Sequence, residues 1–307
     1  MKNSIFFPVI LSFFLISCAH QPPSKIDAVA SLYSKSIVIP NISYLIIDSI
    51  DLKLDAYIPA KNLGGAPWVE YSADRKPVLM YIHGGGWGGL NRSVRNLNFL
   101  PYIDKGWAVV NIDYRLLGQA PFPACIADCR YALNWIYENA DKYKFDTTKI
   151  VVSGESAGGH LALMTGFLTN DREISIPNKP ITRELKTAAV INWFGVSDVE
   201  RLLDFWNSKS FTETLVGDTT KKEEIFKSCS PLTYVNSSTV PVLTIHGDAD
   251  NSVPFIHATL LHESLDKYGV KNNLIVMKGK KHGDFDEKEM SENFSAIWKF
   301  LEEIGIK

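Results

Sequence analysis

Short apolar segments alternate with longer helical segments along most of this chain, and this alternation limits the fold more than any other feature of the sequence. The expected strands cover residues 42–49, 52–58, 78–82, 108–112, 150–153, 188–193, 242–245 and 274–277, and the expected helices cover residues 97–104, 124–140, 157–168, 255–267 and 290–303. Strands that are apolar throughout are typical of a mostly parallel sheet that is covered by helices on both faces. The sequence therefore predicts an α/β fold.

The length and the composition are those of one globular domain. The 307 residues are 46 % hydrophobic and 21 % charged, which excludes a disordered chain, and α/β folds often reach this length as one unit. Lysine and arginine number 32 against 34 aspartate and glutamate residues, with no basic run, so nothing indicates a nucleic-acid partner. We expect a single domain over residues 37–307, and the sequence leaves its oligomeric state open.

One stretch, residues 199–240, interrupts the alternation. It is too long for a simple crossover between two strands, and it contains the aromatic residues Phe205, Trp206 and Phe211. Two interpretations stay open at this point. The stretch forms either a small insertion over the functional site or a pair of ordinary surface helices.

The N-terminus resembles a bacterial lipoprotein signal. Its apolar segment, residues 5–16, is shorter than the ~20 residues that span a bilayer, and it ends in Leu-Ile-Ser before Cys18. This lipobox-like ending predicts a signal peptide over residues 1–17, a lipid on the sulfur of Cys18 and a polar tether over residues 18–36. Because Ala19 rather than aspartate follows, the resemblance implies the outer membrane in a Gram-negative cell envelope. The alternatives are an ordinary secretory signal and a buried N-terminal helix.

The cysteines give no sign of a metal or redox motif. If Cys18 carries lipid, three cysteines remain: Cys125 and Cys129, four residues apart on an expected helix, and Cys229. Export would permit a disulfide, but we expect these residues as small buried side chains. No Cys-x-x-Cys occurs, and no His-Glu-x-x-His, so we expect no metal site.

The most informative motif is Gly-x-Ser-x-Gly around Ser156, between an expected strand and an expected helix. A strand-to-helix turn this sharp strains the serine backbone and leaves no room for side chains two residues away, which explains Gly154 and Gly158. The turn exposes the serine hydroxyl at the carboxyl edge of the sheet and directs the N-terminus of the next helix at it. Ser156 is therefore the predicted nucleophile. The alternative is a purely structural role, in which the serine caps the helix after a glycine-rich turn.

A second motif, His83-Gly-Gly-Gly-Trp87, follows another buried strand. It matches the loop that supplies backbone N–H groups to an oxyanion hole, where glycines let the backbone approach a developing negative charge. The predicted donors are the N–H groups of Gly85, Gly86 and Ala157.

The same loop also matches a dinucleotide-binding fingerprint. Gly84, Gly86 and Gly89 have the spacing Gly-x-Gly-x-x-Gly, and Asp113 ends the next strand, where an acid that binds ribose would lie. The bulky Trp87 argues against this interpretation, because it occupies the turn that should admit a pyrophosphate. The interpretation also leaves Ser156 unexplained, and we expect no cofactor.

In folds that carry this strand–Gly-x-Ser-x-Gly–helix turn, the carboxylate and then the histidine base follow the nucleophile in the chain. His282 lies in a loop after the last expected strand, where it can lean over the sheet edge, whereas His160, His257 and His262 lie on expected helices. His282 is the predicted base. Its acidic partner is expected in a loop that follows a buried strand, where the candidates are Asp198, Asp248 and Asp250.

From about residue 52 to residue 304 the chain resembles α/β-hydrolase-fold carboxylesterases, in particular the hormone-sensitive lipase-like group and the feruloyl or acetylxylan esterase-like group. The resemblance is carried by the motifs above and by Asp113-Tyr114-Arg115-Leu116, Phe122-Pro123-Ala124 and Asp128. It implies an α/β-hydrolase fold: a mostly parallel central sheet with helices on both faces and a small insertion over the site. The family pattern His-Gly-x-x-Asp-x-x-Val-Pro selects Asp250 as the acid. Glu155 departs from the aspartate usual in the first group, which weakens the placement in that group.

The resemblance implies a serine esterase without a cofactor, acting through an acyl-enzyme on short-chain or aromatic acyl esters that are small molecules or linked to polysaccharide. Two alternatives stay open. One is an arylformamidase or another amidase that uses the same three residues, and the other is a non-catalytic binding lipoprotein on an esterase scaffold.

Overall fold

The computed structural model describes residues 35–61, 70–71, 74–94, 96–168, 174–177 and 179–307. The predicted signal peptide, the lipidation site Cys18 and nearly all of the predicted tether lie outside these residues. In the part of the chain that is described, no helix has the length and apolar character needed to cross a membrane.

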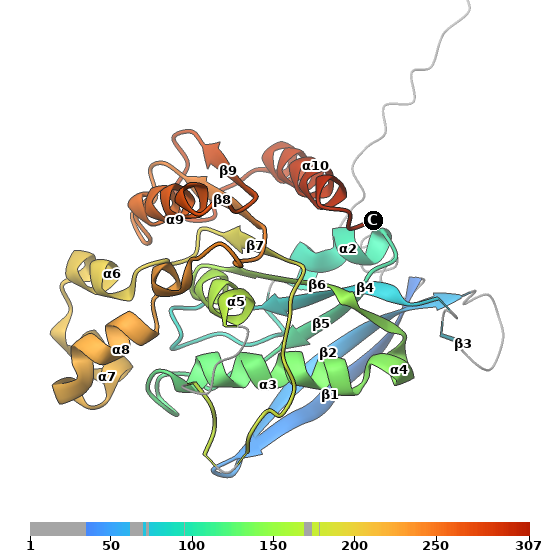
Figure 1. Cartoon of the computed structure of the whole chain (residues 1–307), viewed down its shortest axis with the longest axis horizontal. Helices are drawn as coiled ribbons and strands as arrows, with labels where there is room; N and C mark the ends of the chain where they lie inside the picture. Colours follow the sequence, from blue (N-terminus) through green and yellow to red (C-terminus); the bar gives the residue numbers. More distant parts are fainter. Residues whose placement is uncertain (1–34, 62–69, 72–73, 95, 169–173, 178) are drawn as a thin grey trace, which may run out of the picture.

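The core of the molecule is one twisted sheet, in the order β1-β2-β5-β4-β6-β7-β8-β9, with the short β3 paired to β2 (Figure 1). Neighbours from β5 to β9 run parallel, whereas β1 and β2 form an antiparallel hairpin whose second strand pairs antiparallel with β5. The strands are β1 Ser36–Ile47, β2 Ile50–Lys61, β3 Glu70–Tyr71, β4 Lys76–Ile82, β5 Ala108–Ile112, β6 Phe145–Glu155, β7 Ala189–Trp193, β8 Val242–Gly247 and β9 Asn272–Met277. The expected mostly parallel sheet is confirmed.

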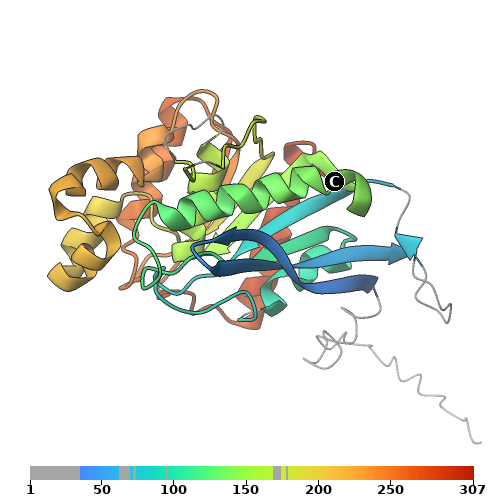
Figure 2. The same ribbon diagram turned by 90° about the horizontal axis from the view of Figure 1, so that it is seen from below.

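Helices cover both faces of the sheet, as the apolar strands require. One buried cluster joins one face to α3, α5 and α9, and a second joins the other face to α2 and α10. The α-helices are α2 Leu100–Asp104, α3 Ala124–Glu138, α4 Ala140–Tyr143, α5 Ala157–Phe167, α6 Val199–Trp206, α7 Lys209–Val216, α8 Lys222–Ser228, α9 Ile256–Lys267 and α10 Glu287–Glu303, and the 3₁₀ turns are η1 Asn96–Phe99, η2 Thr219–Lys221 and η3 Pro231–Tyr234. Figure 2 shows α3 lying along one face of the sheet.

The first strand is longer than the sequence indicates, and its irregularity explains the difference. The strand expected over residues 42–49 begins at Ser36 in the structure. The pairing of β1 with β2 shifts between Ile39 and Ile42, and Asn41 between them has a φ of 60°. This bulge breaks the alternation of side chains from which the start of a strand is predicted.

The segment between β7 and β8 forms three short helices, α6 to α8, which lie together at the left of Figure 1. Polar side chains begin the first two of them. Asp198 accepts a hydrogen bond from the backbone N–H of Arg201 (3.1 Å), and Ser208 accepts one from that of Phe211 (3.4 Å). Such caps satisfy N–H groups that a short helix otherwise leaves unpaired.

Candidate active site

The turn from β6 to α5 carries Ser156 in a strained conformation. Its φ is 55° and its ψ is −118°, a backbone region that residues other than glycine rarely adopt. A Cβ at Gly154 would lie 2.4 Å from the carbonyl oxygen of Gly158, and a Cβ at Gly158 would lie 2.1 Å from that of Ile82. The glycines of the motif are therefore required because backbone fills the space beside them.

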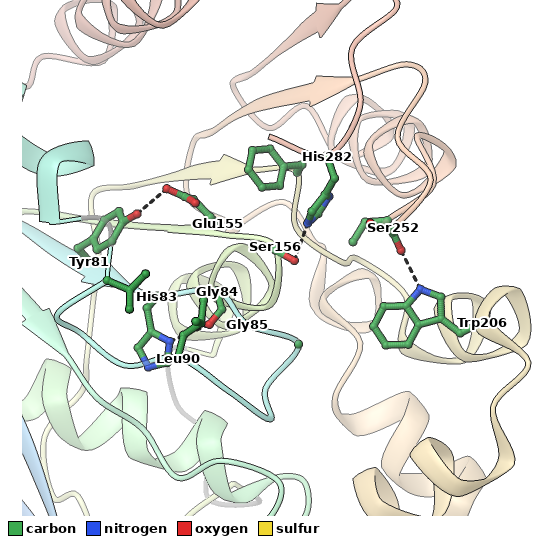
Figure 3. Close-up of a pocket in the computed structure, with 14 residues that line it drawn as sticks. Tyr81, His83, Gly84, Gly85, Leu90, Glu155, Ser156, Trp206, Ser252 and His282 are labelled. Carbon is green, nitrogen blue, oxygen red and sulfur yellow. Dashed lines mark hydrogen bonds between the residues drawn. The ribbon is translucent and has the colours of Figure 1, made fainter. Parts of the chain in front are cut away.

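Ser156, His282 and Asp250 form one chain of hydrogen bonds. The serine Oγ lies 2.9 Å from His282 Nε2, and Asp250 Oδ2 lies 2.6 Å from His282 Nδ1 (Figure 3 shows the first of these bonds). Because an ionised carboxylate only accepts hydrogen bonds, Nδ1 carries the hydrogen and Nε2 is free to accept the serine proton. The three residues follow β6, β8 and β9, so the parallel sheet brings their loops to one edge.

Asp250 is held as a carboxylate by several donors. Its Oδ1 accepts from the backbone N–H groups of Ser252 (2.8 Å) and Val253 (2.9 Å). Burial by itself raises the pKa of this carboxyl, but hydrogen bonds from His246 and His282 outweigh burial and leave the pKa of Asp250 well below its usual value. The negative charge next to His282 is therefore present at neutral pH.

The other two candidate acids stabilise loops. Asp248 Oδ1 accepts from the backbone N–H of Gly279 (2.6 Å), and its Oδ2 lies 3.1 Å from Lys278 Nζ. Asp198 caps α6. Of the three aspartates, the structure brings Asp250 to His282.

The histidines on helices are buried away from the serine hydroxyl. His160 Nδ1 accepts from Trp87 Nε1 (3.2 Å), and its Nε2 lies 2.7 Å from the carbonyl oxygen of Cys229. Burial lowers the pKa of His160 to about 4 and that of His257 to about 3. His262 is bonded to the side chain of Asn272. The bonds of His160 and His262 are thus made to partners other than Ser156.

The glycine-rich loop after β4 lies beside Ser156. Gly85 and Gly86 have φ values of 110° and 59°, which favour glycine, and both line the same cavity as the serine. Behind the loop, the ring of Tyr114 stacks on His83 at 4.3 Å and its hydroxyl donates to the His83 carbonyl oxygen. Ala157, the third predicted donor, is the first residue of α5, where a backbone N–H points out of the helix.

The structure favours this oxyanion-loop interpretation over dinucleotide binding. The indole of Trp87 is buried and donates to His160 Nδ1 on α5. Asp113 is engaged with Arg92: its Oδ1 accepts from the Arg92 backbone N–H at 2.8 Å, and its Oδ2 pairs with the guanidinium. The carboxylate of Asp113 therefore stabilises the segment at Arg92, where the chain leaves the glycine-rich loop.

A cavity of about 310 Å³ opens over the serine. Two of the side chains that line this cavity were not assigned to the site from the sequence. Phe194, directly after β7, packs edge-on against the ring of His282, with the ring centroids 4.7 Å apart. Trp206, at the end of α6, donates from Nε1 to the Ser252 carbonyl oxygen at 2.8 Å (Figure 3). The segment 199–240 therefore contributes one residue, Trp206, to the wall of the cavity. A position at the carboxyl end of a parallel strand was the available signal for Phe194.

Glu155, the departure from the usual pattern, has partners at the edge of this cavity. The hydroxyl of Tyr81 donates to its Oε1 at 2.7 Å, and the side-chain amide of Asn98 donates to the same oxygen. The carboxylate thus ties the end of β6 to β4 and η1.

The three described cysteines, Cys125, Cys129 and Cys229, are buried and free. Within the described residues, no group of three or more His, Cys, Asp or Glu side chains is arranged to hold a metal ion.

Comparison with protein families gives a match to the BD-FAE family over residues 68–265. The chain belongs to this family. Esterase LipC of Mycobacterium tuberculosis is 30 % identical to it over 198 residues, which are 62 % of this chain and 48 % of LipC. The chain thus spans about half the length of the curated relatives it matches.

Two solved structures that are similar to this BD-FAE member are described as esterases. A truncated carbohydrate esterase from gut microbiota superposes with a TM-score of 0.71 at 26 % identity, covering 87 % of this chain and 97 % of that one. Esterase 2 of Thermogutta terrifontis with bound propionate gives 0.70 at 28 % identity, covering 88 % and 95 %. The fold of this BD-FAE protein is the α/β-hydrolase fold of these esterases.

Proposed function

We propose that this protein is a serine carboxylic ester hydrolase that works through an acyl-enzyme. The observation that carries the proposal is the chain of hydrogen bonds from Ser156 through His282 to Asp250, at the floor of an open cavity. Membership of the BD-FAE family and the likeness to solved esterases support it. One of those structures, esterase 2 of Thermogutta terrifontis, is described as phosphoramylated by tabun.

In the proposed reaction, His282 Nε2 accepts the proton of Ser156 as Oγ attacks the ester carbonyl carbon. The N–H groups of Gly85, Gly86 and Ala157 stabilise the negative charge on the carbonyl oxygen, a role in which one donor is typically worth ~2.7–4 kcal/mol of barrier. His282 then gives the proton to the leaving alkoxide, and the alcohol departs. Water, deprotonated by His282, attacks the acyl carbon; the bond to Oγ breaks, the carboxylic acid departs, and His282 returns the proton to Ser156 Oγ. Asp250 keeps the hydrogen on Nδ1 throughout.

The proposed substrates are esters with a short-chain or aromatic acyl group. A cavity of about 310 Å³ walled by Phe194, Trp206 and Leu90 supports a small apolar group next to the serine. The propionate bound to esterase 2 of Thermogutta terrifontis agrees with a short acyl group. Attachment to an envelope membrane through Cys18 is part of the proposal and rests on the sequence alone.

The test is ester hydrolysis by the wild type and by Ser156→Ala. The wild type should hydrolyse aryl esters of short acids and bind a fluorophosphonate covalently. The variant should lose the label and several orders of magnitude of turnover while keeping its fold by circular dichroism. A folded Ser156→Ala protein that still takes up the label would contradict the proposal.

A further inference from the structure

His246 is a fully buried histidine beside the proposed catalytic groups, and the reaction described above does not use it. It is the next-to-last residue of β8, and its Nε2 lies 2.9 Å from the carbonyl oxygen of Val253. The backbone N–H of Val253 in turn donates to Asp250 Oδ1. His246 thus contacts the turn that carries Asp250 through the backbone of Val253.

The same ring nitrogen also faces the carboxylate. His246 Nε2 lies 3.4 Å from Asp250 Oδ2, the oxygen that accepts the hydrogen bond from His282, and neither side chain is exposed. A carbonyl oxygen and a carboxylate oxygen only accept hydrogen bonds, so Nε2 must carry the hydrogen that points at both. Nδ1 has no hydrogen-bonding partner among the described residues. The polar function of this ring is therefore a single N–H aimed at the Asp250 turn.

We propose that His246 is a positioning residue, whose Nε2–H fixes the turn of residues 250–253 and shares Asp250 Oδ2 with His282. This inference rests on the proposed ester hydrolysis. Its physical basis is that a donor near a carboxylate disperses the negative charge of that group. With His246 in place, Asp250 presents one fixed oxygen to His282 and attracts the protonated ring of His282 less strongly than it would alone.

Other ionisable groups around this pair come from several elements, and each must stay unchanged in a test of pH dependence. His257 on α9 interacts electrostatically with His246 and Asp250, and also with Arg201 on α6 and His160 on α5. The loop that carries His282 also holds Lys280, which pairs with Glu289, and Lys281 and Asp284. Glu155 lies at the cavity wall.

The experiment compares His246→Leu, which removes the N–H, with His246→Gln, whose amide can place an N–H near the same position. For His246→Leu, kcat should fall by about 10- to 100-fold, because the acid is less well oriented. The midpoint of the acid limb of the kcat/KM profile should rise by about half a pH unit, because Asp250 then attracts a protonated His282 more strongly. His246→Gln should restore most of both values. If His246→Leu does not fold, His246→Asn, whose shorter amide cannot reach Val253, replaces it.

Two readouts separate positioning from mere stability. The proton on His282 Nδ1, in a 2.6 Å bond to a carboxylate, should give a far-downfield NMR signal that moves in His246→Leu and returns in His246→Gln. The matched control is His262→Leu, another buried histidine, which is bonded to Asn272. It should lower stability without moving the pH midpoint or the NMR signal.

A His246→Leu protein with wild-type midpoint and wild-type signal would overturn the inference, whatever its stability. A shift of equal size in His262→Leu would overturn it as well. Failure of the proposed function is a different result: a wild type that turns over no ester. The NMR comparison can still be read in that case.

Discussion

Two sides of the cavity place the reacting groups in different ways. On the glycine side, formed by Gly84–Gly86 with Gly154 and Gly158, backbone packs against backbone with no room for a methyl group at most positions. On the loop side, formed by residues 250–253 and Trp206, single hydrogen bonds hold the groups: two N–H bonds to Asp250, one from His246 and one from the Trp206 indole. A change on the glycine side should therefore affect fold and activity together, whereas a change on the loop side can affect activity alone.

The strongest test of this contrast is Asp250→Asn on the loop side. An amide at this position places an N–H donor toward His282 and favours the wrong tautomer, so kcat should fall by up to ~10⁴, as in the measured triad of another enzyme. The thermal midpoint should change little, since the amide oxygen can still accept from Ser252 and Val253. Asp248→Asn is the control, because that carboxylate binds Gly279 and Lys278, and it should retain nearly full turnover. Equal losses in both variants would contradict the assignment.

On the glycine side, Gly158→Ala should cost stability first. Its Cβ would lie 2.1 Å from the carbonyl oxygen of Ile82, and backbone cannot yield as a flexible side chain does. We expect a loss of about 3 kcal/mol or more in unfolding free energy, with activity lost in parallel. Gly88→Ala is the matched control, since the nearest atom to its Cβ is 3.8 Å away. Urea unfolding of both proteins gives the comparison, and a Gly158→Ala protein of normal stability would break it.

Trp206→Ala tests whether the loop side sets substrate size. Removing the indole takes away one wall and one hydrogen bond to Ser252, and leaves Ser156, His282 and Asp250 in place. The preference between short and longer acyl esters, measured as the ratio of their kcat/KM values, should shift toward the longer by about tenfold. Trp206→Phe keeps the wall without the hydrogen bond and should shift the ratio much less. An unchanged ratio in Trp206→Ala would show that Trp206 does not limit the bound group.

His160, buried in α5, links Trp87 of the glycine-rich loop to the carbonyl oxygen of Cys229 after α8. Burial lowers the pKa of His160 to about 4, whereas an unfolded histidine titrates near ~6.5. The unfolded chain therefore binds more protons between these values, and stability should fall as the pH falls through this window, by about 1.4 kcal/mol per pH unit for this one group. His160→Gln, which does not titrate, should flatten the measured dependence of unfolding free energy on pH. An unchanged slope would show that other groups govern acid sensitivity.

The same contrast explains how much the sequence could predict. The glycine side could be predicted from short sequence motifs, because each required glycine lies within a few residues of Ser156 or His83. Steric rules then give the backbone conformation of these turns directly. Asp250 was selected by a family pattern and not by geometry. Trp206 meets Ser252 across 46 residues of chain, and Phe194 meets His282 from another strand, so both contacts depend on tertiary packing that no local pattern encodes. The start of β1 could not be predicted, because the bulge at Asn41 interrupts the alternation of side chains and the sequence carries no separate signal for the bulge.

The pairing of β7 with β8 has a consequence for engineering. The three helices α6 to α8 leave one strand and return to its immediate neighbour, where Val190 is paired with Val242 and Trp193 with Ile245. The pairing of β7 with β8 thus fixes the two ends of this segment next to each other, whatever lies between them. Segments of other lengths and sequences could be exchanged here to build libraries with new substrate ranges. Each replacement must still present backbone carbonyls where Cys229 now meets His160 and where Leu215 now meets Phe122.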